Sequence, residues 1–280
     1  MVNDNITYIS HKNKLFNVNF KELWEYRDLI LLFVKRNLTT SYKQTVLGPV
    51  WILINPLLST VVFTVIFGVI AGISTDGIPQ FLFYMSGNVL WNFFSSCLNK
   101  GSSTFISNSH IFGKVYFPRL CTPIAEMIYH FINYLIQTSV YVALVIFYAV
   151  TGANVHPNLL ILLTPVLIFQ TALLGMGTGL IISSVTTKYR DLSILVSFGV
   201  SLWMYITPVV YPVSQIPDFL RPLMLLNPVA PILEAYRCAF MGCGAFYWVY
   251  WLISLAVTAV IVMIGIVVFN KVEKNFIDTV

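Results

Sequence analysis

Six long apolar stretches joined by short connectors constrain the fold of this chain more than any other feature. Each is long enough to cross a hydrocarbon core about 30 Å thick as a helix. With 58% hydrophobic and 10% charged residues, the chain also has too little polar surface for a soluble protein of this size. We therefore predict an all-α integral membrane protein with six transmembrane helices. The predicted spans are Leu47–Gly72, Phe81–Asn99, Pro123–Val150, Asn158–Thr187, Leu192–Val213 and Phe246–Asn270.

Positive charge is distributed unequally between the two sides of the predicted bundle. One side holds only Arg221 and Arg237, and all the remaining Lys and Arg residues fall in the termini and alternate connectors. Because short cytoplasmic loops retain Lys and Arg, both termini are predicted to be cytoplasmic, in a bacterial inner membrane or its equivalent. This bias explains the net charge of +5 without a nucleic-acid partner. The residues on the basic side are Lys12, Lys14, Lys21, Arg27, Lys35, Arg36, Lys43, Lys100, Lys114, Arg119, Lys188, Arg190, Lys271 and Lys274.

Residues 1–46 are predicted to form a cytoplasmic N-terminus that contains an amphipathic helix, followed by a transmembrane domain over 47–270 and a cytoplasmic tail over 271–280. Such a helix should lie in the membrane interface among the lipids, either as a simple anchor or as an element that moves with a cytoplasmic partner. Its apolar half is formed by Phe20, Leu23, Trp24, Tyr26, Ile30, Leu31, Phe33, Val34 and Leu38, whereas Lys35 and Arg36 lie on the polar half and Arg27 is the main exception.

Two connectors on the basic side are candidates for contacts with a partner. Segment 107–122 carries Lys114, Arg119, three aromatic residues and Pro118, which would end a helix. A short helix across the membrane face would fit this pattern, and an ordinary positively charged loop explains the composition as well. The second connector, TTKYRDL, is a tight turn in which Asp191 could pair with Lys188 or Arg190.

The outer segment, residues 214–245, contains four prolines and apolar runs that are too short to cross a bilayer. Two half-helices that enter the membrane and return at Asn227–Pro228 would satisfy this pattern as a short re-entrant segment between helices 5 and 6. Its charged residues are expected to face water or to pair locally, as Glu234 and Arg237 would at i, i+3.

Few residues in the spans suggest chemistry. Glu126 and His130 lie four residues apart in the third span and could relay protons in a secondary carrier; alternatively, they are shallow enough to meet Arg119 or water. The glycine cluster GMGTGL lacks the lysine of a P-loop, so we expect no nucleotide site in this chain. No catalytic residues, metal site or cofactor site is predicted, which disfavours a membrane-embedded enzyme.

Small residues in the spans are assigned to packing. Gly175, Gly177 and Gly179 form a small-xxx-small pattern that suits close helix contact. The four cysteines lack metal-ligand spacing, and packing in the membrane interior is the expected role. A disulfide between Cys238 and Cys243 is the alternative for that pair.

Aromatic residues make up 15% of the chain and cluster on the second and fifth spans. Most are expected to serve helix packing or the interfacial belt. A minority could line a conduit, because sugar rings stack on aromatic faces. The candidates for a glycan conduit are Trp91, Phe94, Trp203, Tyr205 and Tyr211.

Several segments, in this order, resemble the permease subunit of bacterial polysaccharide ABC exporters, the family that moves lipid-linked O-antigen, capsule and teichoic-acid chains. The resemblance extends from about residue 20 to residue 280. Two departures are Asn37, where the family usually has an acidic residue, and Ser41, where it usually has a basic one. The matching segments are Leu23–Leu57, GKVYFPRLCTPIA at Gly113–Ala125, KYRDL at Lys188–Leu192, TPVVYP at Thr207–Pro212, NPVAPILEAYR at Asn227–Arg237 and the C-terminal VEKNFIDTV.

The resemblance implies a homodimeric channel for a lipid-linked polysaccharide, with an O-antigen-type glycan favoured, and two copies of a separate P-loop ATPase subunit that holds ATP and Mg²⁺. This chain would then be a permease and not an enzyme; a drug or lipid ABC exporter is the alternative within the same architecture. The Pro-rich outer segment would form an outer gate. The implied gate and coupling residues are Lys114, Tyr116, Phe117, Pro118, Arg119, Lys188, Arg190 and Asp191, with the N-terminal helix as a further contact.

Overall fold

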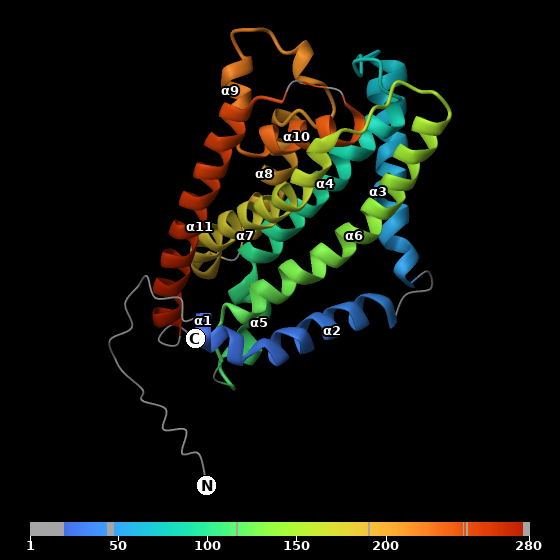
Figure 1. The fold of residues 1–280 in the computed structure, drawn as a ribbon. Coiled ribbons are helices and arrows are strands. Elements are labelled where there is room, and N and C mark those ends of the chain that lie inside the picture. The colour runs from blue at the N-terminus through green and yellow to red at the C-terminus, as the bar shows by residue number, and fades with distance from the viewer. Residues whose placement is uncertain are drawn as a thin grey trace.

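The structure, a computed structural model, describes residues 20–43, 48–115, 117–189, 191–242, 244 and 246–276, without the side chains of residues 20, 42 and 273–276. The described chain is built from helices joined by short turns (Figure 1). The α-helices are α1 (Phe20–Glu25), α2 (Arg27–Lys43), α3 (Trp51–Phe63), α4 (Gln80–Ser102), α5 (Thr104–Phe112), α6 (Cys121–Val150), α7 (Thr164–Lys188), α8 (Leu192–Ile206), α9 (Arg221–Leu225), α10 (Val229–Met241) and α11 (Trp248–Phe276). Short 3-10 segments η1 (Gly48–Val50), η3 (Leu159–Leu163) and η4 (Val213–Gln215) and the π-helix η2 (Thr64–Ile70) complete them.

Within the described residues, four helical segments are long and apolar enough to cross a membrane: Gly48–Ile70, Cys121–Val150, Leu159–Lys188 and Trp248–Val272. They correspond to the first, third, fourth and sixth predicted spans. The chain is therefore a multi-pass membrane protein, as predicted. Leu47, the predicted start of the first span, lies outside the described residues.

The second and fifth predicted spans take a different form. In α4, 16 of the 23 residues are buried by neighbouring helices, so this helix does not need the composition of one that faces lipid. Helix α8 ends at Ile206, short of the predicted Val213. Thr207 adopts an extended backbone before Pro208, because the proline ring disfavours a helical conformation in the residue that precedes it. At 15 residues, α8 is about 22 Å long.

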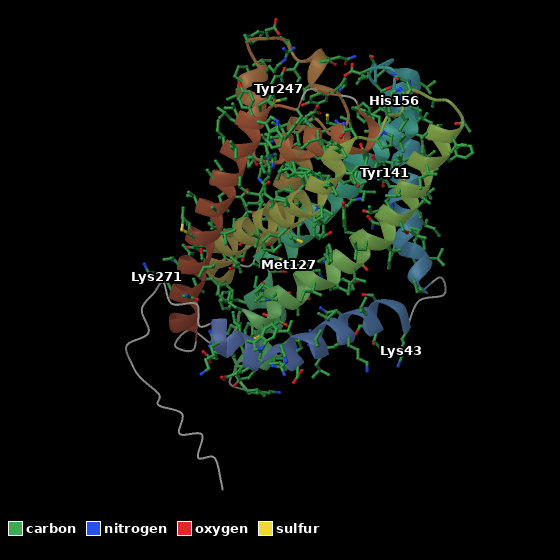
Figure 2. The ribbon with its side chains drawn as sticks, viewed as in Figure 1. Lys43, Met127, Tyr141, His156, Tyr247 and Lys271 are labelled. Atoms are coloured by element: carbon green, nitrogen blue, oxygen red, sulfur yellow. The ribbon has the colours of Figure 1, made fainter. Side chains whose placement is uncertain are left out.

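The two ends of the bundle differ in charge. Figure 1 shows α2 lying across one end, with α5 beside it and α9 at the other. Lys43 and Lys271 lie at the α2 end, and His156 and Tyr247 lie at the opposite end (Figure 2). Thr186 Oγ1 donates to Ser102 O at 2.6 Å, which brings the ends of α7 and α4 together beside α5. The α2 end, here called the basic end, thus gathers Lys35, Arg36, Lys43, Lys100, Lys114, Lys188 and Lys271.

Helix α4 lies at the centre of the larger core and packs against α3, α6 and α7. Its closest approach, to α7, depends on glycine. A Cβ atom on Gly175 would lie 2.7 Å from Phe94 O, and one on Gly179 would lie 2.6 Å from Leu98 O. Gly177 lies on another side of α7 and approaches α11 at Val262. The predicted packing role of the three glycines is confirmed, and it is divided between two neighbouring helices.

We expect Gly179→Ala to destabilise the fold by about 1–3 kcal/mol, because the added methyl group would force the α4 and α7 backbones apart. Gly199→Ala is the matched control: a Cβ there meets no atom within 4 Å, and alanine favours a helix by about 1 kcal/mol over glycine. Thermal unfolding in mild detergent should show a lower Tm for the first variant and an unchanged or higher one for the second. Equal shifts would contradict the close α4–α7 contact.

Candidate functional site

A second, smaller core joins the N-terminal helix to the loop between α5 and α6. Ile30, Phe33 and Val34 of α2 are buried against Phe112 and Phe117. The ring centroids of Phe33 and Phe117 are 5.7 Å apart, and Phe112 is at the same distance from Phe117. Helix α2 is therefore packed against the rest of the protein along this face and is not held by lipid contacts alone.

Neutral side chains of α2 are hydrogen-bonded to α6 further along. Asn37 Nδ2 donates to Glu126 Oε1 at 2.9 Å, and Ser41 Oγ lies 2.8 Å from Tyr129 Oη. Glu126 Oε2 is 3.8 Å from His130 Nε2. The two residues that depart from the family pattern thus contact adjacent turns of α6. The sequence predicted that Glu126 meets Arg119 or water, whereas the polar partner that the structure gives it is Asn37.

The predicted coupling residues differ in exposure. Lys114 is exposed and Pro118 is half-buried, whereas Phe117 is buried in the small core. Arg119 is only 6% exposed, and its guanidinium carbon lies 5.5 Å from the centroid of the Phe112 ring. Among these residues, Lys114 is the best placed to meet another protein, and Arg119 serves the packing of the loop. Tyr116 lies outside the described residues.

The turn between α7 and α8 is exposed at the same end of the bundle. Lys188 and Asp191 are both exposed, and Lys188 Nζ lies 5.1 Å from the centroid of the Tyr189 ring. Arg190 lies outside the described residues. The basic end therefore presents Lys114 and this turn together on its surface.

The N-terminal helix is divided at Tyr26, which is half-buried between α1 and α2. Trp24 is exposed, and the Arg27 guanidinium lies 5.6 Å from its ring centroid. Lys35 is exposed as well, and so is Arg36, whose guanidinium lies 4.9 Å from the Phe33 ring. The predicted apolar half is thus split: one part packs on protein, and another part, including Trp24 and Leu31, is exposed.

The most buried charged residue of the described chain is Arg237 on α10, which is 1% exposed. Its Nη1 donates to Pro208 O and its Nη2 to Val209 O, both at 2.6 Å. Its Nε donates to Ser86 Oγ at 3.3 Å on α4. Its guanidinium carbon lies 3.8 Å from the centroid of the Phe83 ring, also on α4. One side chain therefore joins α10 and α4 to the non-helical segment that follows α8.

Glu234 supplies the counter-charge one turn away. Its Oε1 lies 3.4 Å from Arg237 Nη1, which confirms the predicted i, i+3 pair. Burial raises the pKa of the Glu234 carboxyl above its ordinary value, and Arg237 opposes this shift. Sequence reasoning missed that the pair is buried. Gly87 on α4 leaves room for this side chain, because a Cβ there would lie 2.8 Å from Arg237 Nη2.

A second set of hydrogen bonds connects the same two sequence segments. Asn227 Nδ2 donates to Thr207 Oγ1 at 2.9 Å, and Trp203 Nε1 donates to Asn227 Oδ1 at 3.3 Å. The segments TPVVYP and NPVAPILEAYR, about 20 residues apart in the chain, are thus parts of one site. The two short helices predicted on either side of Asn227–Pro228 are present as α9 and α10.

The five aromatic residues predicted to line a conduit differ in burial and in their contacts. Trp91, Phe94 and Trp203 pack together, with ring centroids 5.2–6.3 Å apart, and Trp91 is only 4% exposed. Tyr211 Oη donates to the carbonyl oxygens of Tyr205 and Ile206 at 3.1 and 3.0 Å. The side chain of Tyr205 is 51% exposed on α8. Of the five, Tyr205 is the one most open to a passing molecule.

The cysteines of the described chain are free. Cys97 and Cys121 are buried, and Cys238 is half-buried on α10. Their burial agrees with the predicted packing role. Cys243, the proposed disulfide partner of Cys238, lies outside the described residues.

A multi-pass bundle with one basic end and a buried ion pair near the other suits a membrane permease. Residues 28–241 match the family described as ABC-2 type transporter, so the chain belongs to that family. It is 27% identical over 253 residues to the O-antigen export system permease protein RfbA of Klebsiella pneumoniae, covering 90% of this chain and 94% of that protein. It is 30% identical over 223 residues to the protein of the same name from Myxococcus xanthus, covering 79% and 83%. The predicted resemblance is confirmed, and family membership implies an ATPase partner subunit.

We expect Arg237→Met to destabilise the protein by about 3–5 kcal/mol, because it leaves the Glu234 carboxylate buried without its counter-charge. Arg221→Met is the matched control: it removes an ion pair of 3.1 Å to the exposed Asp218, which should cost about 0–1 kcal/mol. Thermal unfolding of the purified protein measures both. Adding Glu234→Gln to Arg237→Met should recover part of the loss, and no recovery would contradict the unpaired-charge explanation.

Proposed function

We propose that this chain is the channel-forming subunit of an ATP-driven exporter that moves a lipid-linked polysaccharide, of the O-antigen type, across the bacterial inner membrane. The observation that carries the proposal is the similarity to O-antigen export permeases over most of both chains. The sequence contains no P-loop. ATP and Mg²⁺ therefore belong to a separate ATPase subunit, and this chain binds no cofactor of its own.

The basic end supports a cytoplasmic position for both termini. Lys and Arg in short loops are retained on the cytoplasmic side, and the described Lys residues gather at the end where α2 lies. An ATPase subunit would dock there, on the exposed Lys114 and the turn at Lys188 and Asp191. Motion at that surface would reach the bundle through the Phe33–Phe117 contact and the hydrogen bonds between α2 and α6.

The exposed apolar faces of α3 and α8 support a homodimer. Among the described residues of α8, Val200 alone is buried, and Ile194, Leu195 and Phe198 are all exposed. Helix α3 exposes Leu58 and Val62 in the same way. With a second copy packed against these faces, α8 would serve as the fifth transmembrane span. Helix α4 would be the second span, which gives six transmembrane spans in all. The α9–α10 segment would then be the re-entrant outer gate.

Two other functions are disfavoured. A proton-coupled secondary carrier would use Glu126 and His130, but the ABC-2 family match indicates an ATP-driven transporter. An exporter of drugs or simple lipids shares this architecture, and the similarity to O-antigen export permeases favours the glycan.

The proposal is tested by purifying the tagged chain from its native membranes in mild detergent. We expect a P-loop ATPase subunit to co-purify in equal amount, together with ATP hydrolysis, and deletion of the permease gene should abolish export of one surface glycan. A preparation without a partner and without ATPase activity would favour the secondary carrier. A complete complex in cells whose surface glycans are unchanged by the deletion would favour a drug or lipid exporter.

We expect Lys114→Glu to weaken capture of the ATPase subunit, because it reverses an exposed charge on the proposed docking surface. Arg221→Glu, which changes a cation at the opposite end, is the control and should leave capture intact. The measurement is the ratio of the two subunits after co-purification at several salt concentrations, since exposed charge contacts weaken with ionic strength. Equal ratios for both variants would exclude Lys114 from the interface.

Tyr205→Ala should slow glycan export while ATP hydrolysis and the amount of folded complex stay unchanged, because the exposed side chain supports no packing. Trp91→Ala should instead lower the amount of folded protein, since truncating a buried aromatic residue costs about 3–5 kcal/mol. Export assays and size-exclusion profiles of the two variants separate these outcomes. Normal export by the Tyr205 variant would remove that residue from the conduit.

A further inference from the structure

A polar cavity of about 270 Å³ lies between α2, α3, α4 and α6 near the basic end. Its polar wall is formed by Asn55, Asn92, Ser96, His130, Asn133 and Gln137, with aromatic faces from Trp51, Phe93 and Tyr129. Among the described residues that line it, none is Asp, Glu, Lys or Arg. Such a concentration of neutral polar groups is unusual between membrane-spanning helices, where polar residues are costly and commonly functional.

Hydrogen bonds near a proline fix α3 against the helices that border the cavity. Pro56 in α3 has no N–H, so Ile52 O lacks its usual helical donor. Gln137 Nε2, from α6, donates to this oxygen at 3.2 Å. Asn88 Nδ2 of α4 donates to Pro56 O at 3.0 Å. These bonds fix α3 against both neighbouring helices, so the space between them is part of the folded structure.

Two groups on the cavity wall have hydrogen-bonding capacity that the described chain does not use. His130 Nε2 is buried and makes no hydrogen bond to the described residues; its separation of 3.8 Å from Glu126 Oε2 is too long for one. Asn55 makes none to the described residues either, although it is exposed. A buried polar group without a partner is unfavourable in a membrane, so His130 points to a polar ligand in the cavity.

We propose that this cavity binds one sugar ring of the lipid-linked glycan at the basic end of the permease, before transport; this rests on the function proposed above. Sugar hydroxyls both donate and accept, which suits amides and an imidazole, and the apolar face of the ring suits Trp51 or Tyr129. A phosphate group would need a cation that the lining lacks, and an acyl chain would leave the amides unpaired. The volume is near the lower limit of about 300 Å³ for small-ligand sites, which suits a single ring.

The test is photo-crosslinking in native cells that make the glycan, with the permease assembled with an ATPase subunit that cannot hydrolyse ATP. p-Benzoylphenylalanine replaces Asn55, and in the control it replaces Val62, which is exposed two turns further along α3. After irradiation the tagged permease is purified under denaturing conditions, and attached sugar is detected by periodate oxidation and hydrazide labelling. If the position 55 variant does not accumulate, Ile52, which is half-buried on the same wall, takes the probe.

We expect sugar to be attached to the permease that carries the probe at position 55. We expect none when the probe is at position 62, and none in cells unable to make the glycan. His130→Leu should lower the signal about tenfold, which corresponds to loss of one hydrogen bond to a buried group. Equal labelling at positions 55 and 62, labelling by lipid without sugar, or a signal that persists without the glycan would each overturn the sugar site. If no sugar is captured but permease deletion still abolishes glycan export, the site alone is wrong. If deletion leaves export intact, the proposed function itself fails.

Discussion

The buried Arg237 is the interaction on which the rest of the bundle depends. A guanidinium at 1% exposure is tolerated only when its charge and its donors are all matched, and here the partners come from three segments. Two of these partners are the carbonyl oxygens of Pro208 and Val209. They have no helical hydrogen-bond donor because the chain leaves the helix after Ile206. Satisfying them with one side chain allows α8 to end early and α10 to enter the core.

Polar bonds extend this arrangement to the neighbouring helices. Ser254 Oγ of α11 donates to Pro228 O at 2.6 Å, and Gln170 of α7 bonds both Ser254 and Trp251. At the other edge, the backbone N–H of His156 donates to Met241 O, and Gly242 ends α10 in a left-handed conformation. The short helix α10 is therefore held at both ends. That rigidity suits a segment proposed as an outer gate, which must open as a unit.

The basic end is organised by a different principle. There, apolar contacts of α2 with the loop after α5 hold the protein together, and charge remains on the surface where a partner would dock. Between the two ends, Pro56 leaves the Ile52 carbonyl group without its helical donor, Gln137 satisfies it, and a polar cavity remains beside them. Rigid packing at one end and an exposed charged surface at the other are compatible with a transporter driven from one side.

The sequence by itself determined the four segments that are long and apolar enough to cross the membrane and how charge divides between the ends, because both follow from local composition and length. It also determined the Glu234–Arg237 pair, whose members are one helical turn apart, and the packing role of Gly175 and Gly179. Only the tertiary structure decided that Arg237, Arg119 and Trp91 are buried and that Tyr205 is exposed. A helix in a membrane is apolar whether it faces lipid or protein, so hydrophobic periodicity does not separate these environments. The partners of Arg237 lie about 28 residues away and the cavity needs four helices, so both arise from packing.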